Sequence, residues 1–284
     1  MECLMSKFLT IDQKEMLEKD GFVAPIPIFS KNKARFYRNA LEKFEESVNH
    51  RPPEETLATL SRFKPHLLFR WLDEICHDET LLDVIEDLIG PDLLIYSTAF
   101  FIKNAGDGAY VPWHQDTTYA DFVGGRQVRA WVAFTESNRE NGCMRVIRGS
   151  HHQQLEHIDD PEDSNNILFR KEKIAGPIDE SLSADLVLKP GQMSVHDYGV
   201  IHGSDANHSN DRRIGFAIAF VTPDTKPIGR RETVMVARGM ASSKDWEFEP
   251  RPVVDLNPKA RAAHRRAMEI RGGHFYNSAG AAAD

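Results

Sequence analysis

Cysteine is scarce in this chain of 284 residues: the sequence contains three, Cys3, Cys76 and Cys143. Their number is odd, their spacings are wide, and no Cys-x-x-Cys pair occurs. This pattern argues against a disulfide framework and against a cysteine-rich zinc site. A reducing, cytoplasmic setting is the interpretation that it favours.

A basic excess and long apolar runs are also lacking. The chain has 35 Lys and Arg against 43 Asp and Glu, a formal net charge of −8, so we expect no nucleic-acid partner. No apolar run reaches membrane-spanning length, and the N-terminal stretch has no apolar signal core. The final Ala-Ala-Ala-Asp is not a peroxisomal address. We therefore expect no membrane partner, and the charge is compatible with a small or uncharged substrate.

The composition indicates neither wholesale disorder nor several domains. Hydrophobic residues make up 41% of the chain and charged residues 27%, a balance typical of folded globular proteins. A chain of 284 residues also fits one β-sandwich or barrel domain. We predict a single domain over residues 1–284, with a β core at about residues 93–240 and with the N-terminal helical part and a C-terminal helix packed outside.

Apolar and turn-forming residues predict helices at both ends and strands between them. Helical spacing and caps predict helices at Ile11–Glu18, Asn32–Val48, Glu79–Leu88 and Asn257–Ile270. Short apolar or alternating runs bounded by turn residues predict strands at Leu93–Lys103, Val128–Thr135, Met144–Ile147, Ala184–Leu188, Gln192–His196, Ile214–Val221 and Thr233–Ala237. Many short strands with turn signals predict a sandwich, jelly roll or barrel.

The motif Trp113-His114-Gln115-Asp116 is the main candidate for a metal site. Residues two apart on a strand project to the same side, so His114 and Asp116 can offer a nitrogen and a carboxylate oxygen to one ion. A third ligand is predicted at His202, which follows an extended segment. Two histidines and one carboxylate that leave the other positions of the ion open are diagnostic of non-haem Fe(II) oxygenases.

A second His-x-Asp, His157-Ile158-Asp159, stands beside a polar, acidic stretch and has no convincing strand before it. We interpret it as surface. The chain has 12 histidines, so a chance pairing is a real alternative for any His-x-Asp. The presence of His202 distinguishes His114 from such a pairing.

Arg213 stands at the start of an apolar run, Ile214–Phe220. An arginine that enters a buried strand needs an anionic partner, because an unpaired buried charge is costly. Its guanidinium can hold a carboxylate through two parallel hydrogen bonds. The far carboxylate of 2-oxoglutarate is one such partner, and a core Asp or Glu is the other. The adjacent Arg212 is expected to face solvent.

In their order and spacing these motifs are similar to those of the phytanoyl-CoA dioxygenase family, which includes ectoine hydroxylase. The resemblance covers roughly residues 22–252. The matching stretches are Lys64–Phe69, Phe100–Lys103, Trp113–Asp116, Arg129–Trp131, Glu140–Cys143, Arg148–His151 and His202–Ser204 through Arg213. It implies a mainly β fold with a double-stranded β-helix core, of the jelly-roll or cupin-like type, and flanking helices.

The same resemblance implies roles for individual residues. It places Fe(II) on His114, Asp116 and His202. It places the carboxylate of 2-oxoglutarate on Arg213, with the Ser204 hydroxyl as a second contact.

The resemblance also implies further contacts. Trp131, Gln115 and Lys64 match other co-substrate contacts of the family, with core packing the alternative for Trp131 and a solvated lysine the alternative for Lys64. Tyr119 and His196 could face the substrate, with loop packing and a hydrogen-bonded core histidine as the respective alternatives.

The implied reaction uses Fe(II), 2-oxoglutarate and O2, hydroxylates an unactivated C–H of a small-molecule or acyl-type substrate, and releases succinate and CO2. Related halogenases have a small residue in place of the carboxylate ligand, so the intact Asp116 favours hydroxylation. Desaturation, cyclisation or endoperoxide formation with the same cofactors is one alternative, and a non-catalytic jelly-roll binding module with a structural metal is another. A homodimer and a lid formed by Asp159–Asp179 are further hypotheses.

Overall fold

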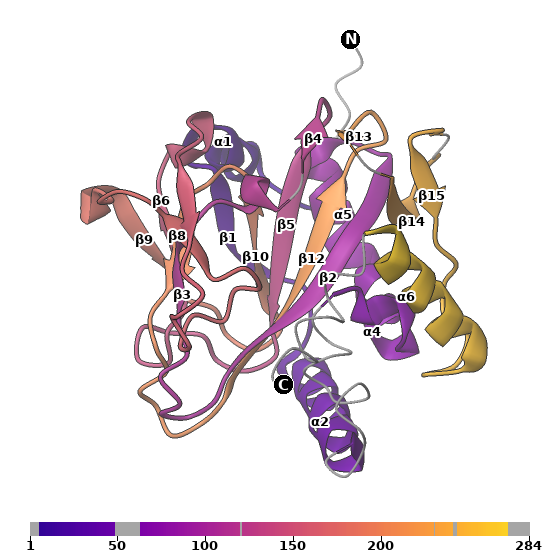
Figure 1. Ribbon diagram of the computed structural model, residues 1–284, viewed down its shortest axis with the longest axis horizontal. Coiled ribbons are helices and arrows are strands. Elements are labelled where there is room, and N and C mark those ends of the chain that lie inside the picture. Colours follow the sequence, from indigo (N-terminus) through magenta and orange to yellow (C-terminus); the bar gives the residue numbers. More distant parts are fainter. Residues whose placement is uncertain (1–5, 49–62, 120, 230, 241–242, 272–284) are drawn as a thin grey trace. The chain divides into compact units, whose positions relative to one another are not determined.

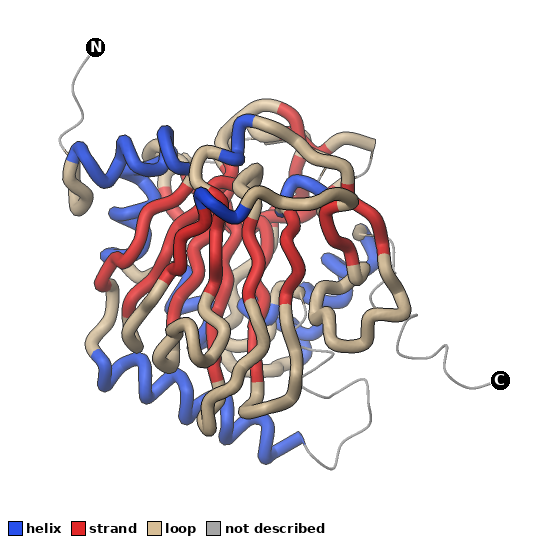
Figure 2. The backbone as a smooth tube through the Cα atoms, turned by 90° about the vertical axis from the view of Figure 1, so that its left-hand side faces the viewer, coloured by secondary structure: helices blue, strands red, loops and turns tan. Residues whose placement is uncertain are grey.

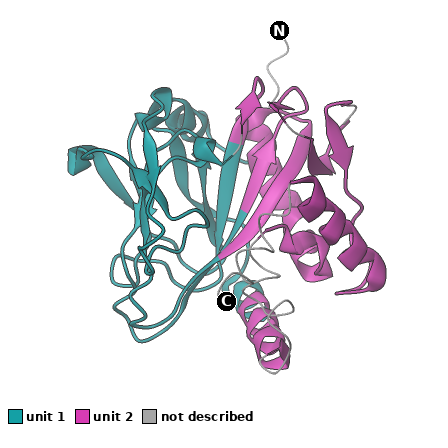
Figure 3. Cartoon of the chain, viewed as in Figure 1, with its two compact units in different colours: residues 1–36, 101–120, 128–217 teal, residues 37–100, 121–127, 218–284 magenta. Residues whose placement is uncertain are grey.

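The structure is a computed structural model that describes residues 6–48, 63–119, 121–229, 231–240 and 243–271 (Figure 1). The chain divides into two compact units, each built from three separate stretches (Figure 3). The first unit comprises residues 1–36, 101–120 and 128–217, and the second comprises residues 37–100, 121–127 and 218–284. The single domain expected over residues 1–284 stays a prediction. Within the described ranges, no helix has both the length and the apolar character needed to cross a membrane.

Besides the short β7–β8 pair, the described part of the first unit contains strands of two larger sheets. One sheet has the order β1-β10-β5-β12 here, and its strands are Phe22–Pro27, Gln192–Asp197, Gln127–Ala133 and Arg213–Val221, the last of which passes into the second unit from Ile218. The other sheet has the order β3-β11-β6-β9, and its strands are Val111–His114, His202–Ser204, Met144–Ile147 and Ser183–Leu186. Figure 2 shows the strands of this unit side by side, joined by loops at their ends.

Side chains from both sheets meet in one core. Phe22 of β1, Val146 of β6 and Leu186 of β9 form a buried cluster with Val200. A second cluster contains Trp131 and Ala133 of β5, Ala217 of β12, and Leu188. Two antiparallel sheets that share a core are the arrangement of a jelly roll, so the predicted mainly β fold is confirmed.

The β7–β8 hairpin of the first unit corrects one expectation. His157–Asp159 forms β7, which pairs with β8, Glu172–Ile174. His157 therefore lies on a strand, and its Nε2 accepts a hydrogen bond of 3.0 Å from the backbone N–H of Gln115. Asp159 is exposed, as expected, and forms an ion pair with Arg170. Whether Asp159–Asp179 acts as a lid stays a prediction.

The predicted helices are all present, with small shifts at their ends. Figure 1 labels them α1, Ile11–Asp20; α2, Lys31–Val48; α5, Glu79–Ile89; and α6, Pro258–Ile270. Asp78 caps α5 by accepting hydrogen bonds from the N–H groups of Thr80 and Leu81. The helix α4, Arg70–Cys76, was not predicted, because its 7 residues are too few for a periodic pattern.

The second unit has its own strands, in the order β2-β14-β15. These strands are Leu93–Lys103, Glu232–Arg238 and Trp246–Phe248. The first of them passes into the first unit at Phe101. The helix α6 packs against β14 and against the 3-10 helix η2, Pro65–Leu67. A short pair, β4 (Phe122–Val123) with β13 (Lys226–Pro227), also lies in this unit.

Candidate metal centre

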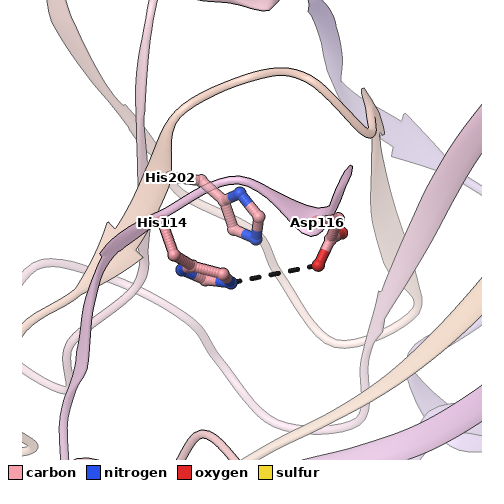
Figure 4. Close-up of side chains that lie close together, drawn as sticks. All are labelled: His114, Asp116 and His202. Atoms are coloured by element: carbon pink, nitrogen blue, oxygen red, sulfur yellow. Dashed lines mark ion pairs between the residues drawn. The ribbon is translucent and has the colours of Figure 1, made fainter. Parts of the chain in front are cut away.

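The three predicted metal ligands come together in the first unit (Figure 4). His114 is the last residue of β3, and His202 is the first residue of β11, directly opposite it in the antiparallel pair. Asp116 begins the 3-10 helix η3, Asp116–Thr118. One ligand atom from each residue lies within 4.8 Å of the others, and all three side chains are buried. The strand ends before Asp116, so a tight turn rather than strand alternation brings the carboxylate to the histidines.

Backbone contacts orient the two imidazoles. The Nδ1 atom of His114 lies 2.9 Å from the carbonyl oxygen of Pro112, and Nδ1 of His202 lies 3.1 Å from that of Val200. A proton on Nδ1 satisfies each carbonyl and leaves the lone pair on Nε2 for a metal. Burial lowers the pKa of His114 to about 4 and that of His202 well below its usual value, so both rings are neutral at neutral pH.

The two oxygens of the Asp116 carboxylate have different neighbours. Oδ1 lies 3.9 Å from Nε2 of His114 (Figure 4). Oδ2 lies 2.7 Å from Nε of Arg129 and 3.5 Å from Nε2 of His196. Arg129 and His196 face each other across β5 and β10. Burial alone would raise the pKa of Asp116, but Arg129 and the neighbouring imidazoles hold it well below its usual range. The carboxylate therefore stays ionised and can offer an oxygen to a metal ion.

A cavity extends from His202 to Arg213, and its lining includes Trp131, Met144 and Ser204. The Arg213 side chain is 2% exposed, and its Nη1 donates a hydrogen bond of 2.6 Å to the carbonyl oxygen of Gly142. In the part of the chain that the structure describes, no carboxylate pairs with it, and its Nε has no partner. Burial lowers its pKa to about 10, which still leaves a cation at neutral pH. The alternative of a core Asp or Glu partner is therefore not supported.

The indole of Trp131 lies beside this guanidinium. The centre of the Arg213 guanidinium is 5.1 Å from the ring centroid. A Cβ atom on Gly215 would lie 1.8 Å from the indole Cζ2, so only glycine at position 215 leaves room for the ring. Trp131 thus packs in the core and also lines the cavity, which combines the two roles considered for it.

Lys103 is a second buried basic side chain near the cavity that the motifs alone did not assign. Its Nζ donates hydrogen bonds to the Ser204 hydroxyl at 2.6 Å, to the Ser204 carbonyl at 3.0 Å and to the Asp205 carbonyl. Burial and then the charge of Arg213 lower its pKa to about 6. The signal in the sequence was the alternation of Phe101 and Lys103, which places both on one side of β2.

The other predicted contacts have different surroundings. The side-chain amide of Gln115 donates hydrogen bonds to the carbonyl oxygens of Gln153 at 2.8 Å and Gly199 at 2.6 Å. Both amide hydrogens are therefore engaged, and neither is free to bind an anion. Lys64 belongs to the second unit, where its ammonium lies 2.5 Å from Glu249 and 2.7 Å from the Thr233 carbonyl. Lys64 is fully buried, so the alternative of a solvated lysine is wrong.

The two predicted substrate contacts both lie beside the ligands. The Tyr119 and His114 rings are edge to face at 6.3 Å, and the His196 and His202 rings are 4.6 Å apart. Nε2 of His196 lies 3.5 Å from Oδ2 of Asp116, and its Nδ1 is buried without a hydrogen-bond partner in the described part of the chain. The contact of His196 with the substrate stays a prediction.

Known proteins that are similar to this chain include a non-heme monooxygenase and several dioxygenases. The solved apo structure of the non-heme monooxygenase ThoJ is similar to this chain, with a TM-score of 0.83 and 31% identity. The match covers 94% of this chain and 99% of that structure. A probable alpha-ketoglutarate-dependent hypophosphite dioxygenase of Stutzerimonas stutzeri is 26% identical, and the match covers 64% of this chain. A phytanoyl-CoA dioxygenase domain-containing protein 1 homolog of Dictyostelium discoideum is 27% identical over 54% of this chain. The matches span 66% and 55% of these two relatives.

A family model covers most of the chain. The model of the phytanoyl-CoA dioxygenase family, PhyH, matches residues 17–215, a range that includes the candidate ligands and Arg213. The chain belongs to the phytanoyl-CoA dioxygenase family.

Proposed function

We propose that this protein hydroxylates an unactivated C–H of a small-molecule or acyl-type substrate, with Fe(II) held by His114, Asp116 and His202 and with 2-oxoglutarate held by Arg213. One observation carries the proposal. A buried donor set of two neutral imidazoles and one carboxylate adjoins a cavity that ends at a buried guanidinium without a carboxylate partner in the described chain.

The donor set suits Fe(II) better than a structural zinc. Zinc in structural sites has four ligands and is often held by thiolates, whereas three N and O ligands on one face suit Fe(II) that binds a co-substrate. Cys143 is the cysteine of the first unit that the structure describes, and burial raises the pKa of its thiol to about 11, so it is no thiolate at neutral pH. These properties argue against the binding-module alternative.

The residues around the ligands define what the protein does for the reaction. When bound, iron would supply the chemistry that couples oxidative decarboxylation of 2-oxoglutarate to oxidation of the substrate. Arg213 would fix the far carboxylate of the co-substrate through charge-assisted hydrogen bonds. The Trp131 indole would close one wall, and Arg129 would keep Asp116 ionised and oriented. The burial of all three ligands excludes bulk water from the reacting atoms.

The substrate side is less closely defined than the co-substrate side. The intact carboxylate ligand favours hydroxylation over chlorination, because Asp116 occupies the position that a halide would need. The names of the relatives, which include hypophosphite and phytanoyl-CoA, support a small-molecule or acyl-type substrate. Tyr119 and His196 flank the ligands and are our candidates for contact with it.

Anaerobic titration of metal-free protein with Fe(II) and then 2-oxoglutarate tests the proposal. We expect a visible charge-transfer band that requires both additions, is absent in His114→Ala and needs more 2-oxoglutarate in Arg213→Ala. His208→Ala, which removes an exposed histidine of the same unit, is the matched control and should behave as the wild type. Absence of the band in wild-type protein would contradict the proposal, and tightly bound zinc without a response to 2-oxoglutarate would favour the binding module. With a substrate in hand, the product mass separates hydroxylation from desaturation, cyclisation and endoperoxide formation.

A further inference from the structure

Two buried basic side chains approach the same end of the cavity. Arg213 lines it directly, and Lys103, whose side chain is fully buried, reaches it through Ser204. In the described part of the chain, no carboxylate forms an ion pair with either group. A buried guanidinium without an anionic partner is unfavourable, and a second basic group beside it adds to the cost, so this end of the cavity is built to receive negative charge.

The bond between Lys103 and Ser204 has a defined polarity. A carboxylate on Arg213 would favour the ammonium form of Lys103, which can only donate, so the Ser204 oxygen accepts this hydrogen bond of 2.6 Å. A serine hydroxyl has one hydrogen, and that hydrogen then stays available for another acceptor. Ser204 lines the cavity beside Arg213, so the acceptor that it faces is whatever anion Arg213 holds.

Lys103 is itself held in place from several sides. Its Nζ also donates to the Ser204 and Asp205 carbonyls, and its own carbonyl accepts a hydrogen bond of 3.1 Å from Nδ2 of the buried Asn207. Strand alternation puts its side chain on the same side as Phe101, which lines the cavity. The amine is therefore fixed beside Ser204, which lines the cavity.

We propose that Lys103 is a positioning residue for the co-substrate: it holds the Ser204 hydroxyl so that its hydrogen points to the 2-oxoglutarate carboxylate on Arg213. The inference rests on the proposed function. Burial and the charge of Arg213 lower the pKa of Lys103, and a carboxylate on Arg213 would raise it again and favour the ammonium form.

Anaerobic binding of 2-oxoglutarate to the Fe(II)-loaded protein tests this role, with the charge-transfer band as the signal. Lys103→Met keeps the length of the side chain but removes the donor, and we expect a Kd that is about tenfold to hundredfold weaker, as for loss of a charge-assisted hydrogen bond. Lys103→Arg, which keeps a donor and a charge, should recover most of the affinity. In turnover, the KM for 2-oxoglutarate should rise while kcat at saturation changes little.

A double variant separates action through Ser204 from general damage. If Lys103 acts through the hydroxyl, Lys103→Met combined with Ser204→Ala should bind 2-oxoglutarate within about threefold of the weaker single variant. Lys189→Met removes an exposed lysine of the same unit and should bind as the wild type does. Unfolding midpoints of the Fe(II)-loaded variants show whether each is folded, and Lys103→Gln, which removes the charge but stays polar, carries the test if the methionine variant is not.

The outcomes distinguish the two proposals. The role of Lys103 would be overturned, and the proposed function left intact, by either of two results with a wild-type protein that gives the band. One is an unchanged affinity of Lys103→Met for 2-oxoglutarate, and the other is a double variant in which the two losses of affinity multiply fully. An equal loss in Lys189→Met would also overturn it. A wild-type protein that gives no band would overturn the proposed function and this inference together.

Discussion

His202 lies directly opposite His114 in the antiparallel β3–β11 pair, and the centroids of the two imidazole rings are 4.1 Å apart. Each ring has its Nδ1 beside a backbone carbonyl two residues earlier in the chain, at Pro112 and at Val200. The strand register and these two contacts therefore aim both Nε2 atoms at the point that the Asp116 carboxylate also reaches.

His202→Ala should lower the affinity for Fe(II) by more than about 100-fold, because losing a ligand costs more than losing a group that only orients one. The fold should survive, since the ring is neutral and its one backbone contact is weak. Anaerobic competition with a coloured chelator measures the affinity. The exposed His208→Ala is the control, and equal metal affinity in both variants would show that His202 is no ligand.

Arg129→Met should destabilise the metal-free protein by about 3 kcal/mol, because it leaves the buried Asp116 carboxylate without its cation. Bound Fe(II) supplies that positive charge, so the loss should be much smaller in the loaded protein. Anaerobic urea unfolding with and without Fe(II) measures both free energies. Arg139→Met breaks an exposed pair with Asp185 and should cost less than about 1 kcal/mol in either state. A loss for Arg129→Met that is independent of iron would contradict this account.

Gly215→Ala should weaken 2-oxoglutarate binding and cost roughly 1–3 kcal/mol of stability, since its Cβ would overlap the Trp131 indole and push it away from Arg213. Gly176→Ala is the matched control, because a Cβ at that position meets nothing within 4 Å. Thermal unfolding and the anaerobic titration report the two effects. A Gly215→Ala protein with wild-type affinity would mean that Trp131 does not shape the co-substrate site.

Glu172→Gln should change the pH dependence of stability. Burial raises the pKa of Glu172 to about 7, and the nearby Asp116 adds to the shift. The folded state thus favours the protonated acid, and the stability from this group is complete below its unfolded pKa of about 4.5 and is lost as the pH rises through about 7. The glutamine variant should therefore match the wild type at pH 5 and exceed it at pH 8 by on the order of 1–3 kcal/mol. Urea unfolding at both pH values measures this, and identical pH profiles would be evidence against it.

The strongest sequence signals were those with a regular period. The strands Leu93–Lys103 and Met144–Ile147 have the predicted bounds, because short apolar runs between turn residues mark them clearly. The strands β11 and β7 have 3 residues each, too few for any period, and they were missed.

In the site, too, some contacts could be predicted from the sequence and others could not. The spacing of the motifs placed His114, Asp116 and His202 together, and the structure groups them. The contact of Arg129 with Asp116 depends on how the chain turns after β3, and that of Lys103 with Ser204 depends on where two distant strands end. Neither is visible in a linear sequence. Gln115 and Lys64 were matched by position alone, and hydrogen-bond partners that the sequence does not reveal occupy their donors.

A crystal structure of the protein grown without oxygen, with Fe(II) and 2-oxoglutarate, would show directly whether the proposed residues hold the metal and the co-substrate. We predict one anomalous iron peak bounded by Nε2 of His114, Nε2 of His202 and an oxygen of Asp116, with the far carboxylate of 2-oxoglutarate on Arg213. An iron peak elsewhere, or a carboxylate that does not reach Arg213, would contradict it.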